Sequence, residues 1–212
     1  MEFARMIDLV LPEARYRFAA ALMEMHSDRK QVFVDRLGWT LPAPGSWLEV
    51  DQFDNEFAVY LLALEGQRHQ GSVRLLPSSC PTMLASLFPG LCPDGVPEGE
   101  DVWEISRLVT SPRDACGSSV LKLHRLLALA LIEFALLNGI RRYNLVAEAR
   151  RVPALLAIGW AVAPLGLPTV CAGEELQALQ VRIDEETLER VRARVRLWNP
   201  VLQVREEHKW AA

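Results

Sequence analysis

Hydrophobic and polar positions fall into short blocks along this chain, and the blocks predict a mixture of helices and strands. Residues 14–37 contain neither proline nor glycine, which predicts a helix, and Ser27 and Asp28 mark a break within it because both residue types cap helices. After a loop rich in proline, short apolar runs are bounded by turn residues, as strands are. The strands predicted in this half are residues 47–50, 57–64, 71–76 and 102–110, with a hairpin between the second and the third.

The second half of the chain alternates helices with strands. Its most apolar stretch, residues 120–137, predicts a helix that Ser118 or Ser119 caps and Gly139 ends. A strand–helix–strand crossover implies parallel pairing, whereas the earlier hairpin implies antiparallel pairing. The pattern therefore predicts an α/β fold, a three-layer α/β/α arrangement around a mixed sheet. The remaining predicted elements are strands at residues 143–147, 160–163 and 176–183 and helices at residues 153–158 and 184–197.

The composition fits one globular domain. The 212 residues are 50% hydrophobic and 24% charged, so we expect a single domain over residues 1–212. The formal net charge of -4 excludes a global basic field of the kind that recruits nucleic acid or anionic membranes. Charges such as Lys122 and Glu133 inside the apolar stretch favour a helix buried against a sheet over a membrane span.

The cysteines and histidines predict no metal site. No two cysteines form a C-x-x-C pair, and no histidine lies near them at ligand spacing. We therefore expect free thiols in a reducing cytoplasm, and the N-terminus lacks the pattern of a signal peptide. The four cysteines are Cys80, Cys92, Cys116 and Cys171.

Charged and aromatic residues in the first half suggest chemistry. Arg29 and Phe33 share a helix face, although each residue taken alone would be read as a surface charge or a core residue. Arg74 lies inside an apolar strand, where an unpaired charge is costly, so a carboxylate such as Asp51 or Asp54 is its natural partner.

Glu104 and Arg107 lie three residues apart on one predicted strand. Simple alternation of side chains would place them on opposite faces of the sheet. A bulge near Ser106 would bring both side chains to the same face, and we predict one there.

Together these spacings resemble the acyl-homoserine-lactone synthases, the autoinducer synthases of bacterial quorum sensing. The resemblance fills every family position between about residues 15 and 110, whereas beyond residue 115 it is one of pattern only. The matching features are Arg29, Phe33 and Trp39, the segment Asp51-Gln52-Phe53-Asp54, the run G-S-V-R-L-L-P at residues 71–77, Phe88 after Pro81, Met83 and Leu84, and the segment Trp103-Glu104-Ile105-Ser106-Arg107.

The resemblance implies a fold like that of the N-acetyltransferases and a reaction in two steps. The amine of S-adenosylmethionine attacks an acyl thioester, and the methionyl carboxylate then closes a lactone and releases 5′-methylthioadenosine. Glu104 would be the base and Arg107 the ligand of the carboxylate, with Ser106 in the same catalytic group. The other implied groups are Phe33, Trp39 and Phe88 around the sulfonium, and Arg29, Asp51, Asp54 and Arg74 as ion pairs that hold an N-terminal lid of about residues 1–54.

The sequence departs from related patterns at two places. Residues 113–119 miss the spacing of the glycine-rich pyrophosphate loop of acetyltransferases, which makes an ordinary acetyl-coenzyme A enzyme less favoured. Asn144 stands where family members that make 3-oxoacyl signals often carry threonine, which puts a 3-oxo product in doubt. The predicted acyl-binding residues are Asn144, which could hydrogen-bond a substituent, and Leu108, Val146, Leu155 and Leu156, which would serve equally well in a plain core.

The resemblance also implies partners. The expected partners are S-adenosylmethionine, which is a substrate and not a cofactor, and an acyl donor carried on acyl carrier protein or coenzyme A. Two alternatives stay open: an N-acyltransferase of the same fold that acts on another amine, and a binding module without catalysis. Basic residues that could meet either anionic carrier are Lys122, Arg141, Arg142, Arg150 and Arg151.

Overall fold

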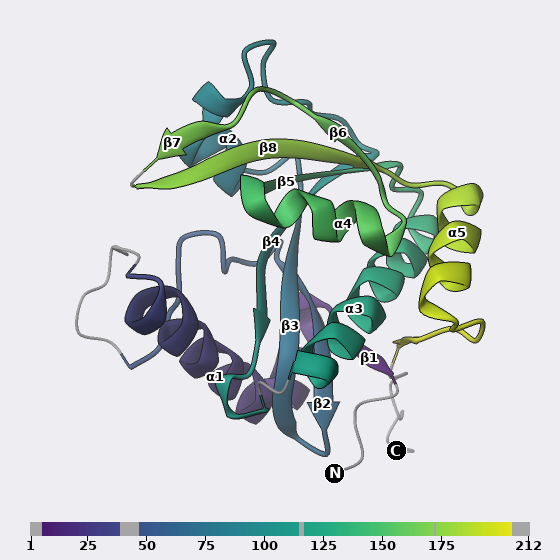
Figure 1. The fold of residues 1–212 in the computed structure, drawn as a ribbon. Helices are drawn as coiled ribbons and strands as arrows, with labels where there is room; N and C mark the ends of the chain where they lie inside the picture. The colour runs from purple at the N-terminus through teal and green to yellow at the C-terminus, as the bar shows by residue number, and fades with distance from the viewer. Residues whose placement is uncertain (1–5, 39–46, 115–116, 172, 205–212) are drawn as a thin grey trace.

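The computed structural model of the protein describes residues 6–38, 47–114, 117–171 and 173–204, and its central feature is one mixed sheet (Figure 1). The strands follow the order β6-β8-β5-β4-β3-β2-β1-β9, and β7 pairs with β8. The strands are β1 (Ile7–Val10), β2 (Val59–Glu65), β3 (Arg68–Pro77), β4 (Val102–Thr110), β5 (Arg142–Glu148), β6 (Ala161–Pro164), β7 (Thr169–Cys171), β8 (Glu174–Arg182) and β9 (Leu202–Gln203).

Helices cover both faces of this sheet, so the predicted three-layer α/β/α fold is confirmed. The larger core lies between the sheet and α3, α4 and α5, and it is filled by Leu127, Ile132 and their neighbours. On the opposite face, α1 packs over β1, β2 and β3, and α2 packs over β5 and β8. The helices are α1 (Ala19–Arg29), α2 (Met83–Leu87), α3 (Gly117–Leu137), α4 (Val152–Ile158) and α5 (Glu185–Val195).

The strand pairings predicted for β2 with β3 and for β4 with β5 are present. β2 and β3 form the predicted antiparallel hairpin, and Gly66 adopts a positive φ of 64° in its turn, which glycine tolerates best. β4 and β5 are parallel, as the crossover through α3 requires. Their pairing runs from Val102 to Ile105 and stops there, although both strands continue. Beyond Ile105, the backbone groups on the edge of β4 that faces β5 are therefore not paired with β5 in the described part of the chain.

The break predicted at Ser27 and Asp28 does not form, because α1 runs through both residues and neither caps a second helix. The helix instead changes type after Arg29, where a π-helical segment (Lys30–Arg36) continues the same helical rod. The wider turn of a π-helix changes the direction in which its side chains project, and such segments are frequent at functional sites. This segment carries Phe33.

Several sequence predictions were wrong or incomplete. Residues 47–50 form no strand, because this segment is a loop in which Glu49 turns into the protein. The short strands β1, β7 and β9 were missed, and so was the one-turn helix α2 inside the long proline-rich connection. None of the helices in the described ranges is long and apolar enough to cross a membrane. Cys80, Cys92 and Cys171 are free thiols, whereas Cys116 lies outside the described residues.

Candidate active site

A buried ion network lies between α1 and the sheet. It joins α1, the loop after it, β3 and β4, and we call it the six-residue network. Its three arginines and three carboxylates balance in formal charge, and all are almost fully withdrawn from solvent. Its members are Arg29, Glu49, Asp51, Asp54, Arg74 and Arg107.

Asp54 is the centre of one half of this network. Its two carboxylate oxygens accept hydrogen bonds from Arg29 Nη1 and Nη2 at 2.8 and 3.0 Å. Arg74 Nη1 donates to Asp54 at 2.9 Å and to Asp51 at 2.6 Å, and its Nε donates to the hydroxyl of Ser106 at 3.1 Å. The hydroxyl of Tyr60 donates to Asp54 at 2.8 Å. The predicted ion pairs among Arg29, Asp51, Asp54 and Arg74 therefore form.

Arg107 belongs to the other half, and a bulge in β4 brings it there. Across from Arg107 and Leu108, β3 offers only Val73, and Arg107 adopts a φ of 54°, which is rare for a residue other than glycine. Its Nη2 lies 3.0 Å from Glu49 and 2.6 Å from Asp51. The predicted bulge is thus confirmed at the residue that follows Ser106.

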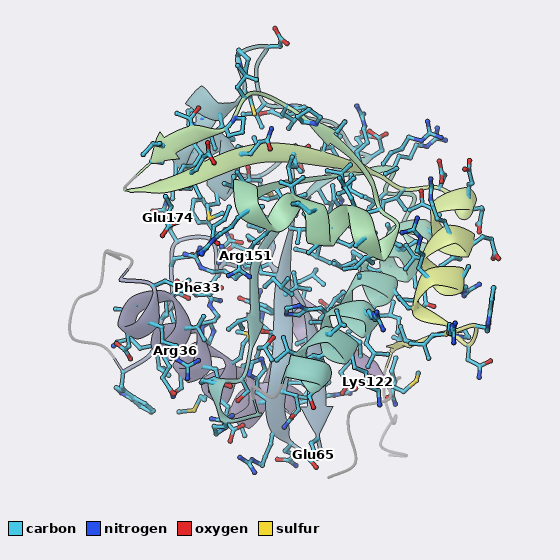
Figure 2. All side chains as sticks on the ribbon, in the orientation of Figure 1. Phe33, Arg36, Glu65, Lys122, Arg151 and Glu174 are labelled. Carbon is cyan, nitrogen blue, oxygen red and sulfur yellow. The ribbon has the colours of Figure 1, made fainter. Side chains whose placement is uncertain are left out.

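Phe33 and Met83 complete the surroundings of Arg107. The guanidinium carbon lies 5.5 Å from the centroid of the Phe33 ring, within range of a cation–π interaction. Phe33 is labelled in Figure 2. Its Nη1 lies 3.2 Å from the sulfur of Met83. The structure therefore places Phe33 of the π-helical segment and Met83 of α2 against the guanidinium of Arg107 on β4.

The pKa values distinguish Arg107 from the other two arginines. Burial by itself would lower the pKa of Arg29 and of Arg74, but their carboxylate partners, Asp54 first, outweigh it and raise both pKa values. For Arg107, burial lowers the pKa more than Glu49 and Asp51 restore it. Burial therefore outweighs the carboxylate partners only at Arg107 among these three arginines.

Glu104 is held in a separate arrangement beside this network. Its carboxylate accepts the backbone N–H groups of Met83 at 3.0 Å and Leu84 at 2.7 Å, which lie in the first turn of α2. Burial raises the pKa of Glu104 above its ordinary value, although these two N–H groups act in the opposite direction. A buried carboxylate with a raised pKa is well suited to exchange a proton near neutral pH.

The aromatic residues predicted to surround a sulfonium are placed in part. Phe33 lies beside Arg107, whereas Phe88 ends α2 and packs against the clusters that contain Met83 and Val146. Met83 connects the two regions, because its amide contacts Glu104 and its sulfur contacts Arg107. Trp39 lies outside the described residues.

The five predicted acyl-binding residues do not form one common wall. Asn144 and Val146 lie on the face of β5 that α2 covers, whereas Leu155 packs against the core on the opposite face. Leu108 and Leu156 are both largely exposed. The amide of Asn144 is already bonded at both ends, to the carbonyl of Pro97 at 2.8 Å and to the side chain of Gln180 at 2.9 Å.

Glu49 is the residue of the network that the predicted site omitted. It bridges Arg29 and Arg107, and its backbone is tied to His26 by a hydrogen bond in each direction. Its sequence neighbourhood showed an acid two residues before Asp51, but nothing in that pattern distinguished a buried bridge from a solvated turn. Among the described residues, no group of three or more histidine, cysteine or acidic side chains is arranged to hold a metal ion.

Comparison with known proteins finds a family model and sequence relatives that agree on one family. The model of the family described as "Autoinducer synthase" matches residues 13–191. An isovaleryl-homoserine lactone synthase of Bradyrhizobium diazoefficiens is 34% identical over 194 residues, which cover 90% of this chain and 85% of that protein. An acyl-homoserine-lactone synthase of Pseudomonas aeruginosa is 34% identical over 111 residues, which cover 51% of this chain and 55% of that protein.

Solved structures agree with these sequence relatives. A coenzyme A-dependent acyl-homoserine lactone synthase, solved with S-adenosylmethionine and isopentyl-coenzyme A, superposes with a TM-score of 0.87 at 32% identity. That superposition covers 96% of this chain and 94% of the other. A putative N-acetyltransferase of Lactobacillus plantarum, at 17% identity and a TM-score of 0.57 over 84% of this chain and 99% of that one, shares the fold.

Proposed function

This chain belongs to the autoinducer synthase family, and we infer that it is an acyl-homoserine lactone synthase whose acyl donor is a coenzyme A thioester. The observation that supports this most is the meeting of Glu104, Phe33 and Arg107 around Met83, beside the edge of β4 that β5 leaves unpaired. We place the reaction there. S-adenosylmethionine serves as a substrate, and the free thiols agree with action in the cytoplasm.

The reaction has two bond-forming steps. The amine nitrogen of S-adenosylmethionine attacks the thioester carbonyl, the carbon–sulfur bond of the thioester breaks, and the thiol leaves with the proton that the amine gave up. The methionyl carboxylate then attacks its own γ-carbon, and the bond between that carbon and the sulfonium breaks. The products are the acyl-homoserine lactone, free coenzyme A and neutral methylthioadenosine.

Glu104 is the base of the first step in this proposal. An amine must lose its proton to be a nucleophile, and burial has raised the pKa of Glu104 toward the range where it can accept one. The developing oxyanion of the thioester needs donors that are already oriented. Backbone N–H groups at the bulge of β4, next to Ser106 and Arg107, are suitably located for that role.

Arg107 is the arginine best suited to take the methionyl carboxylate. Arg29 and Arg74 have raised pKa values and are satisfied by their partners, whereas the pKa of Arg107 is lowered by burial. Arg107 is also the arginine that lies against Phe33 and Met83, where the substrate is proposed to bind, and a guanidinium can hold a carboxylate in a two-pronged pair. Phe33 beside it, with Phe88 and Trp39, would face the sulfonium, and each aromatic ring contributes about 0.5–2 kcal/mol to holding a cation. The other members of the network would hold the N-terminal lid of about residues 1–54.

The acyl chain would lie on the face of the sheet that α2 covers. Val146 and Phe88 are partly buried there and adjoin an apolar cluster that includes Leu84 and Leu91. Because Pro97 offers only an acceptor, the amide nitrogen of Asn144 must point to it, which leaves its oxygen to Gln180. A side chain engaged at both ends favours an acyl group without an oxygen substituent at C3. Leu108, Leu155 and Leu156 play no part in this proposal.

The test is product formation by the purified protein. We expect methylthioadenosine and an acyl-homoserine lactone from S-adenosylmethionine and short acyl-coenzyme A esters, with weaker turnover of the same acyl groups on acyl carrier protein. Mass spectrometry identifies the lactone. Absence of methylthioadenosine with every donor would refute the synthase, whereas turnover only with acyl carrier protein would refute the assignment of coenzyme A.

A further inference from the structure

A second ion cluster, half of it buried, lies on α1, next to the six-residue network but separate from it. We call it the α1 anchor, and its members are Glu24, Asp28, His69 and Arg113. Asp28 and His69 have no exposed side-chain surface. None of these residues takes part in the proposed chemistry, and burial of charged groups is costly, so their arrangement requires an explanation.

Asp28 is the centre of the anchor. Because a carboxylate can only accept, His69 Nδ1 donates to it at 2.7 Å. Arg113 donates a hydrogen bond from Nη2 to Asp28 at 3.1 Å, and its Nη1 forms an ion pair with the other carboxylate oxygen at 3.0 Å. Glu24, one turn earlier on α1, accepts the backbone N–H of His69 at 2.9 Å. The anchor thus ties one face of α1 to the start of β3 and to the turn after β4.

Asp28 and Arg29 are adjacent and point into different clusters. Successive residues of a helix project about 100° apart, so fixing the direction of Asp28 also fixes the direction of Arg29. Arg113 follows β4 by three residues, and Arg107 lies on β4 itself. The two clusters therefore tie the same helix to the same strand at two points, and two points define an orientation (Figure 1).

Apolar packing holds α1 on the sheet through few side chains. Those of α1 are Ala21, Met25 and the partly buried Leu22, with Phe18 just before the helix. Burial of such side chains stabilises the helix but is not directional. The ion pairs at both clusters are directional, so they determine how α1 sits on the sheet.

We propose that Asp28 and Arg113 are positioning residues for the S-adenosylmethionine site. Their ion pair orients α1 so that Arg29 reaches Glu49 and Asp54, and so that Phe33 lies against Arg107. This inference rests on the proposed function, because it assigns the site around Phe33 and Arg107 to S-adenosylmethionine. It concerns the affinity for that substrate and not the chemical step or the acyl donor.

The experiment compares Arg113→Gln, Arg113→Lys and Asp28→Asn with the wild type in the full-length protein. Calorimetry gives the Kd for S-adenosylmethionine, and release of methylthioadenosine gives KM for each substrate. The matched control is Arg192→Gln, because Arg192 is also a half-buried arginine that pairs with a buried acid, Glu133, and with an exposed one. It lies on α5, on the other side of the sheet.

We expect Arg113→Gln and Asp28→Asn to raise the Kd and KM for S-adenosylmethionine roughly five- to fiftyfold, since small misplacements of binding groups have large effects. KM for the acyl donor should stay within about twofold, the pattern of a loss confined to one substrate. Arg113→Lys, which keeps the positive charge beside Asp28 but not the planar guanidinium, should retain part of the affinity that Arg113→Gln loses. Arg192→Gln should change neither constant.

Unchanged affinity in Arg113→Gln, equal losses for both substrates, or the same losses in Arg192→Gln would overturn the positioning role. Arg113 is 33% exposed, so its replacement decides the matter if Asp28→Asn does not fold. An active wild type with unaffected variants refutes this proposal alone. A wild type that binds S-adenosylmethionine without turnover refutes only the proposed function, and one that binds none refutes both.

Discussion

Replacement of Glu104 by glutamine can test its role in catalysis separately from its role in stability. The comparison is possible because the chain contains a second buried carboxylate, Glu133, that also accepts two backbone N–H groups. Glu104 accepts two consecutive backbone N–H groups, from Met83 and Leu84. In Glu104→Gln one oxygen becomes an NH2 group, which must face one of these donors. One hydrogen bond to a charged acceptor is lost, at a cost of about 1.5–3 kcal/mol in the free energy of unfolding.

The catalytic loss expected from this replacement is larger than the structural loss. For a domain of this size, 1 kcal/mol shifts Tm by about 2–4 °C, so the melting temperature should fall by roughly 3–12 °C. Removal of a general base lowers the rate about 10²- to 10⁴-fold, which corresponds to roughly 3–5 kcal/mol in the activation free energy. The assay is kcat from methylthioadenosine release, with both substrates saturating, at a temperature well below either melting point.

Glu133 supplies the control. It is buried in α3, and its Oε2 atom accepts two consecutive backbone N–H groups, from Val201 at 2.9 Å and Leu202 at 2.8 Å. Because both groups donate to one oxygen, glutamine at this position can keep both hydrogen bonds. Glu133→Gln, which removes the same buried charge, should therefore lower Tm by less than Glu104→Gln and leave kcat almost unchanged. The reasoning is refuted if Glu104→Gln keeps more than about a tenth of the wild-type kcat, a loss below the range for a base, or if Glu133→Gln loses as much.

Two further outcomes follow from the six-residue network and from Glu104. Asp54→Asn leaves three buried arginines with two carboxylates and should lower the free energy of unfolding by about 3–5 kcal/mol. Urea unfolding measures this loss, and a loss below about 1 kcal/mol, the scale of an exposed ion pair, would contradict the prediction. Because the pKa of Glu104 is raised, kcat should fall with decreasing pH at values above the ordinary glutamate pKa of about 4.3. The pKa of Asp54 lies well below its usual range in the folded protein, because Arg29 and Arg74 outweigh burial. Asp54 therefore stabilises the fold fully above its unfolded pKa of about 3.9, and this stabilisation is lost only as pH falls toward the lower pKa of the folded state. Circular dichroism should therefore show folded protein across the interval in which activity falls, and simultaneous loss of both signals would contradict this.

The parts of the site that could be predicted from the sequence are those where a residue does not fit the strand in which it lies. A charge inside an apolar strand indicated the partners of Arg74, and a three-residue separation indicated the bulge before Arg107. The sequence did not reveal α2, because this single turn is stabilised by the distant carboxylate of Glu104 in addition to its local cap, Thr82. The bridge made by Glu49 was hidden for a similar reason, since its partners lie 20 and 58 residues away.

The position of α2 has a consequence for the reaction. Glu104 holds the first turn of α2 only as strongly as its charge allows, because hydrogen bonds to a carboxylate are stronger than those to the neutral acid. If Glu104 is the base, as proposed, its hold on Met83 and Leu84 weakens once it has taken the proton of the amine. Met83 also contacts Arg107, and Phe88 at the end of α2 borders the region proposed for the acyl chain. In the proposed reaction, the proton transfer that starts the first step would therefore weaken the contacts that hold α2, which would couple this step to the wall of the proposed acyl site.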